Sequence, residues 1–136
     1  MKGRSIGAVF AGIIAGVVVS YILWAQLEKA YPIEKELLEA LLKDREGFRE
    51  YMRNLPAGYH LGGIGIGCLR LIIGLVIGHL IDKSNAMTLI VIAAFCLLLA
   101  ILDSFAMPHP VWYGLVYIPT LILIALGFIF MKRRSA

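Results

Sequence analysis

Two charged residues lie inside long apolar runs of this sequence, and they are the residues best placed to do chemistry there. Arg70 stands near the middle of one run, and Asp103 is the acidic residue within the next run. A charge in an apolar phase is costly and normally faces the interior of a helix bundle with a partner. The two runs go in opposite directions, and a long arginine side chain can reach across a small difference in height. The sequence therefore predicts an Arg70–Asp103 ion pair.

Two further ionisable residues extend this candidate polar cluster toward one end of the runs. His60 begins the run that holds Arg70, and Glu28 follows the first apolar run of the chain. A buried ion pair can fix the register of helices without any ligand. The four groups, Arg70, Asp103, His60 and Glu28, could instead hold an anion or lead protons outward. Both uses stay open at this point.

Two sequence motifs of catalytic and metal sites are missing. The zinc motif His-Glu-x-x-His and a phosphate-binding glycine loop are both absent from the sequence. The glycine-rich run at 62–67 lacks the strand and the lysine of such a loop, which favours a close-packing helix surface. Cys68 and Cys96 lie in apolar runs, where a thiol behaves as a small apolar side chain. We expect no metal, no cofactor and no enzyme activity, with a membrane enzyme acting on a lipid or quinone as the least favoured alternative.

The composition indicates which elements must position these residues. The chain has 136 residues, of which 60% are hydrophobic and 16% charged, and its mean hydropathy is +0.85. Soluble domains average about 45–50% apolar and about 25% charged residues. Because a membrane-spanning helix takes about 20 residues, the chain has room for about four spans and for no large soluble domain. We predict a single all-α integral membrane domain over residues 1–136, a four-helix transmembrane bundle with spans at about 6–25, 60–81, 86–107 and 111–131.

The residues between the first two spans carry much of the charge. Apolar residues recur at helical spacing through 32–55, while Glu, Lys and Arg fill the other face. Pro32 suits a first helical position, and Gly47 is able to bend or split a helix. This pattern predicts an amphipathic extramembrane helix over about 32–55, which lies flat on the bilayer or packs across the ends of the spans.

Small residues form a stripe on each of the first two spans. Successive residues of a helix are about 100° apart, so residues four apart share a face, and small ones there let a neighbouring backbone come close. Ala8 and Ser20 extend the first stripe, and Arg70 shares the face of the second. We therefore expect these two helices to pack together. The glycines of the stripes are Gly12 and Gly16 on the first span, and Gly63, Gly67, Gly74 and Gly78 on the second.

The distribution of charge predicts the orientation. One side of the predicted bundle receives six basic residues and one acidic residue, and the other side receives six basic and seven acidic residues. Lys2 and Arg4 adjoin the first span, and the last span ends on the basic cluster 132–134, so the positive-inside rule favours both termini in the cytoplasm. A signal peptide is disfavoured, because the first run is longer than such peptides need. This topology explains the net charge of +4 without a nucleic-acid partner.

Aromatic residues mark the predicted outer side. A belt of amphipathic rings there would sit at the level of the lipid headgroups. The rigid turn Pro108-His109-Pro110 also faces this side, and we expect a solvated His109 in it. The residues of the predicted belt are Trp24, Tyr31, Tyr59, Trp112 and Tyr113.

Short motifs punctuate the chain: Tyr31-Pro32 after the first span, Tyr51 and Leu55-Pro56 at the end of the charged segment, a Gly-rich second span, and Pro108-His109-Pro110-x-Trp112 before the last span. Together they resemble a loose group of small four-span bacterial membrane proteins of unassigned activity. The resemblance covers nearly the whole chain. It implies the architecture and a bacterial inner membrane, and it implies no activity and no functional residue.

Two functions fit these observations. The leading interpretation is a compact, non-enzymatic membrane protein that acts as an accessory or assembly subunit through its Gly-rich helix faces. Its partners would be the lipid bilayer and a second copy or another membrane protein. The alternative is a small dimeric transporter or channel that uses Arg70 and Asp103 for an anion or for protons. A cavity that reaches Arg70 would favour transport, whereas an enclosed Arg70 would favour a structural role.

Overall fold

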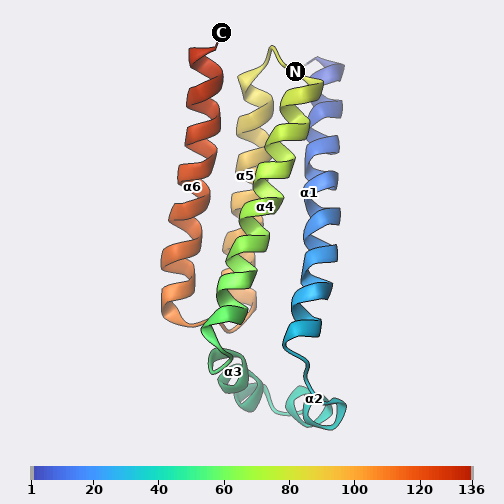
Figure 1. The fold of residues 1–136 in the computed structure, drawn as a ribbon, viewed down its shortest axis with the longest axis vertical. Coiled ribbons are helices and arrows are strands. Elements are labelled where there is room, and N and C mark those ends of the chain that lie inside the picture. The colour runs from blue at the N-terminus through green and yellow to red at the C-terminus, as the bar shows by residue number, and fades with distance from the viewer. Residues whose placement is uncertain (1, 136) are drawn as a thin grey trace.

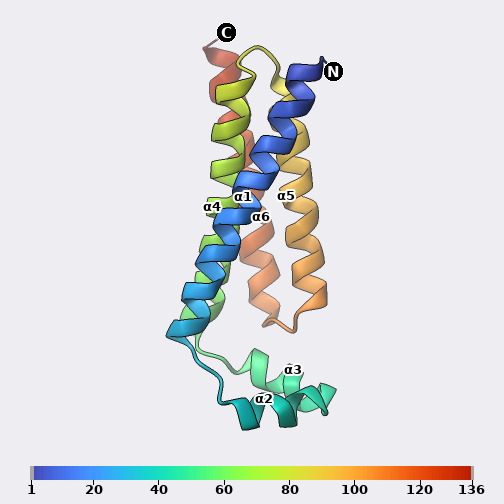
Figure 2. The same cartoon turned by 90° about the vertical axis from the view of Figure 1, so that its right-hand side faces the viewer.

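The computed structural model describes residues 2–135, and within that range the chain forms six helices and no strand. Four long helices stand side by side as a bundle, and two short helices lie across one end of it (Figure 1). Both termini lie at the opposite end, which we call the terminal end, as a second view shows (Figure 2). The helices are α1 (Gly3–Ala30), α2 (Lys35–Leu42), α3 (Arg45–Arg53), α4 (Ala57–Ile81), α5 (Ala86–Ala106) and α6 (Val111–Arg134).

Helices α1, α4, α5 and α6 are each long and apolar enough to cross a membrane. The described residues therefore have the architecture of a multi-pass membrane protein. The predicted all-helical fold with four candidate spans is confirmed. Three of the long helices extend beyond the predicted spans. Helix α1 runs on to Ala30, α4 already begins at Ala57, and α6 ends within the basic cluster at Arg134.

The segment 32–55 forms two short helices, so the single amphipathic helix predicted there is not confirmed. The break falls at Lys43 and Asp44, whereas Gly47 lies inside α3. Asp44 has extended backbone angles, and its carbonyl accepts the N–H of Phe48 at 3.0 Å, so it starts a new helix. Aspartate favours helix starts over helix interiors, and Asp44 takes the N-cap position here without a hydrogen bond from its side chain to the backbone of α3. Pro32 lies before α2 and outside any helix.

Helices α1 and α4 make the most extensive contact of the bundle. The buried residues of α1 lie on one stripe: Ser5, Ala8, Gly12, Gly16 and Ser20. A Cβ atom placed on Gly12 would lie 2.6 Å from the carbonyl oxygen of Gly74, and one on Gly16 would lie 2.6 Å from that of Arg70. The two backbones therefore approach as closely as glycine allows, as the two stripes predict.

The remaining glycines of the α4 stripe make room for side chains. The ring of Trp24 lies 3.1 Å from the Cβ position of Gly63, and the ring of Tyr117 occupies the space beside Gly67. The Ile92 side chain of α5 fills the space beside Gly78. All the predicted stripe glycines thus serve contacts within the chain's own bundle.

Asp82 accepts hydrogen bonds from three helices at the terminal end. Ser5 of α1 and Thr88 of α5 donate hydrogen bonds to the same carboxylate oxygen, at 2.5 and 2.9 Å, and Ser84 donates to the other at 3.0 Å. Lys132 of α6 donates to the Asp82 carbonyl at 3.4 Å. These bonds hold the pKa of Asp82 at about 2, because hydrogen bonding to a carboxylate favours its charged form. The sequence showed Asp82 only as part of a charged break between spans.

Candidate functional site

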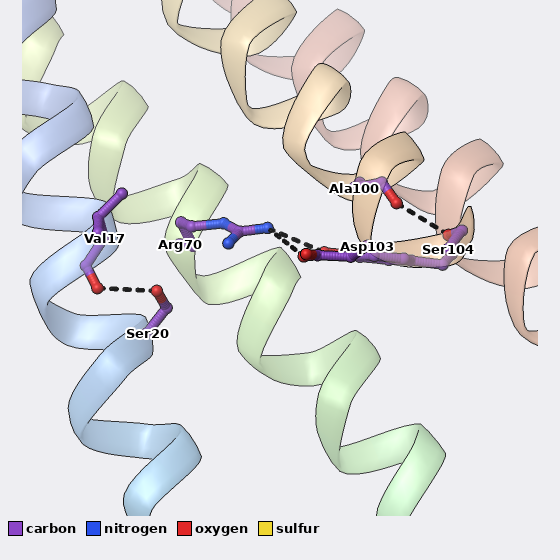
Figure 3. Close-up of polar contacts among 7 residues, drawn as sticks. Val17, Ser20, Arg70, Ala100, Asp103 and Ser104 are labelled. Carbon is purple, nitrogen blue, oxygen red and sulfur yellow. Dashed lines mark hydrogen bonds and ion pairs between the residues drawn. The ribbon is translucent and has the colours of Figure 1, made fainter. Parts of the chain in front are cut away.

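Arg70 of α4 and Asp103 of α5 form the predicted ion pair, and Figure 3 shows the two side chains pointing toward each other. The Nη2 atom of Arg70 lies 3.6 Å from Oδ2 of Asp103. The same nitrogen donates a hydrogen bond of 3.2 Å to the hydroxyl of Tyr117. The Arg70 side chain is 10% exposed, whereas that of Asp103 is 51% exposed. The pair therefore has one enclosed member and one half-exposed member.

The packing around Arg70 explains how a charge is held inside the bundle. Gly16 of α1 lies against its backbone, and Gly67, one turn before it on α4, leaves space for the Tyr117 ring. Tyr117 and Tyr113, one turn apart on α6, are both buried. The sequence interpretation missed Tyr117. Two tyrosines four residues apart in an apolar run were the available signal, because a buried tyrosine hydroxyl usually has a hydrogen-bond partner.

A cavity of about 230 Å³ opens at the α2–α3 end of the bundle, and Asp103 lines it. Glu28, at the end of α1, lines it too, so the structure brings together these two members of the predicted cluster. Arg70 is not among the described residues that line this cavity. It contacts Asp103, which does line the cavity. The full lining is Trp24, Glu28, Tyr59, Asp103, Met107, His109 and Tyr113.

His60, the fourth residue of the predicted cluster, pairs with His109. The two Nδ1 atoms lie 3.3 Å apart, so one ring must donate and the other accept. Within the described residues, Nε2 of the buried His60 has no hydrogen-bond partner. His60 thus joins the turn between α5 and α6, and the structure shows no direct contact from it to Arg70 or Asp103 in residues 2–135.

The expectation of a solvated His109 is wrong. Its ring stacks on Tyr113, with centroids 3.8 Å apart and planes within 10°. Burial, with a smaller contribution from His60, lowers the pKa of His109 from its ordinary 6.5 to about 4. The two prolines beside it fix this turn, which places the imidazole over the ring of the following helix. His109 is therefore neutral at physiological pH.

The aromatic residues of the predicted belt gather at this end and form a connected cluster. Tyr59 is its centre: its ring centroid lies 6.1 Å from that of Trp24 and 5.7 Å from that of Tyr31. His60 links this group to Trp112 at 6.0 Å and to Tyr113 at 6.1 Å. Gly62 and Gly63 leave space on α4 for the Leu27 side chain and the Trp24 ring.

No protein-family model, curated protein or solved structure matches this sequence. Within residues 2–135 no three His, Cys, Asp or Glu side chains gather in a way that could hold a metal ion, and Cys68 and Cys96 are free thiols. The site is a small cavity lined by aromatic rings and by the carboxylates of Glu28 and Asp103. Arg70 lies behind Asp103 and pairs with it.

Proposed function

We propose that this protein is a non-enzymatic accessory or assembly subunit of a bacterial inner membrane. The observation that carries the proposal is the enclosure of Arg70. Its guanidinium contacts Tyr117 of α6 and Asp103 of α5, and its backbone lies against Gly16 of α1. An arginine bound in this way joins the helices of the bundle, which is the structural use of an intramembrane charge.

The proposed orientation places the terminal end in the cytoplasm and α2 and α3 on the outer surface. Lys2, Arg4 and the basic cluster 132–134 gather at the terminal end, as the positive-inside rule favours for cytoplasmic residues. Every residue of α2 (Lys35–Leu42) is at least partly exposed, and Leu37, Leu38 and Leu42 are exposed apolar side chains. A helix with this pattern suits the boundary between headgroups and acyl chains.

The stripe glycines already pack inside the chain, so a partner has to contact outward faces of the bundle. Helix α6 has the least buried apolar stretch of the four long helices. The experiment is a native mass measurement after purification in mild detergent from the membrane of a bacterial host. We expect a complex heavier than one chain, containing a second copy or another membrane protein. A lone chain with nothing bound would contradict the proposal.

A small dimeric transporter is the second candidate, and the cavity that reaches Asp103 favours it. A path for protons would run from Glu28 through Asp103 toward Arg70. In proteoliposomes this function would give a proton flux that Asp103→Asn abolishes, whereas an accessory subunit would give none. An anion is the less suitable substrate, because the charged residues that line the cavity are carboxylates.

A further inference from the structure

The cavity at the α2–α3 end carries an unbalanced negative charge. Asp103 is neutralised by Arg70. Glu28 is exposed and has no ion-pair partner among residues 2–135. His109 adds no positive charge at neutral pH, because burial and His60 hold its pKa at about 4. A ligand with one positive charge would balance the cavity.

Aromatic rings form much of the remaining lining. Trp24 and Tyr59 meet at an angle of 60° with centroids 6.1 Å apart, and Tyr113 also lines the cavity. Tyr113 is fixed by the stacked ring of His109. A cation over the face of Trp or Tyr is attracted by the ring, and this attraction grows when the site is partly desolvated. Aromatic walls with a carboxylate are the means by which proteins recognise alkylated ammonium groups.

From this lining we infer that the cavity binds the ammonium group of a small organic cation, whose charge Glu28 balances and which lies against the rings of Trp24 and Tyr59. The volume of about 230 Å³ lies below the roughly 300–1,000 Å³ of pockets for drug-sized ligands, which limits the ligand to a small headgroup. A metal ion is less suitable, since residues 2–135 bring no three metal-binding side chains together.

Such an ammonium group has two sources. It can belong to a free small molecule, or it can be the headgroup of a lipid whose chains lie along the apolar helices. The cavity is lined by the ends of α1, α4, α5 and α6 and by the turn between α5 and α6, so both sources can reach it at this end of the bundle. The shared chemistry is the cationic nitrogen with its alkyl substituents, and a test with two arms separates the sources.

The first arm uses tetramethylammonium chloride and the fluorescence of Trp24. Trp112, the other tryptophan, is replaced by Trp112→Phe, and the protein is kept in a nonionic detergent. We expect a saturable change in Trp24 emission that sodium chloride at the same concentration does not cause. Glu28→Gln should weaken binding at least about tenfold, because it removes the unpaired charge beside the ligand. The matched control Glu36→Gln lies on α2, outside the cavity lining, and should leave binding unchanged.

Calorimetric titration of the chain with both tryptophans present checks that Trp112→Phe has not altered the site. The inference is overturned by three outcomes: no saturable binding, an equal response to sodium, or equal binding by wild type and Glu28→Gln. Glu28 is exposed, so its substitution tests the charge without disturbing the core.

The second arm repeats the titration in bilayer discs of phosphatidylethanolamine and of phosphatidylglycerol. If the lipid headgroup is the ligand, the ethanolamine lipid will compete and raise the tetramethylammonium concentration needed for half-saturation. If a free cation is the ligand, the two discs will give the same value at a sodium chloride concentration that screens the surface charge of phosphatidylglycerol. Both results support an ammonium site and assign its source.

Discussion

Arg70 reaches Tyr117 across the bundle at 3.2 Å, and the same nitrogen atom faces Asp103. One guanidinium group therefore connects α4 with α6 and with α5. The connection depends on Gly67, which leaves the space that the Tyr117 ring occupies. It gives an intramembrane charge a structural use, because each of its contacts fixes how one helix lies against another.

The ion pair predicts a particular pattern of single and double substitutions. Asp103→Leu leaves the buried Arg70 charge with Tyr117 alone, and we expect it to cost about 1–3 kcal/mol. Arg70→Leu should cost less, because the Asp103 side chain is 51% exposed and regains water. The double substitution should be less harmful than Asp103→Leu. Thermal unfolding in mild detergent measures all three, and two single variants as stable as wild type would show that the pair contributes nothing.

Substituting glycines by alanine distinguishes positions in the closely packed stripe from positions with free space beside them. Gly16→Ala should destabilise by about 1–3 kcal/mol, since the new Cβ would lie 2.6 Å from a backbone oxygen that cannot move alone. Gly65→Ala is the matched control on α4, with nothing within 4 Å of its Cβ position. It should be neutral or stabilise by up to about 1 kcal/mol through helix propensity. Equal effects of the two changes on the unfolding temperature would refute the close α1–α4 contact.

Part of this architecture was predictable from the sequence, because local patterns determine it. The long apolar runs predict the spans, the spacing of Gly12 and Gly16 predicts the packed face of α1, and the cost of a membrane charge predicts a partner for Arg70. The position of Asp103 on the adjacent span then identified that partner.

The other features depend on how distant elements meet in three dimensions. The contact of Tyr117 with Arg70 requires α6 to lie over Gly67, and the pairing of His60 with His109 requires the α5–α6 turn to fold over α4. The Asp82 hydrogen bonds come from residues far apart in sequence. Periodicity gives the face of a helix, but it does not give the neighbour of that face or the rotamers that meet there.

The terminal end should lose stability in strong acid. Hydrogen bonds from Ser5 first, and then from Thr88 and Ser84, lower the pKa of Asp82 from 3.8 to about 2. The unfolded chain therefore takes up the proton at a higher pH than the folded protein does. This contribution is complete above about pH 4 and is lost as the pH falls from 3.8 through about 2. Unfolding temperatures measured across this range should fall for wild type, while Asp82→Asn should be less stable at neutral pH and lack this decline.

The α2–α3 end should respond to milder acid. The pKa of His109 is about 4 in the folded protein and 6.5 ordinarily, because burial and the neighbouring His60 disfavour its charged form. The stability of this end is therefore complete above about pH 6.5 and declines as the pH falls toward 4. Trp24 and Trp112, both close to this cluster, report it through their fluorescence during thermal unfolding. His109→Asn should remove the decline; if the variant and wild type keep the same pH dependence, His109 is not its cause.

The proposed accessory role is tested most directly by one native mass measurement, made on wild type and on the Arg70→Leu/Asp103→Leu double variant purified side by side in mild detergent. If the ion pair is structural and the chain acts through its outward faces, both proteins will appear in a complex heavier than a single chain. A wild-type protein that appears only as a single chain, with no partner bound, would contradict the account.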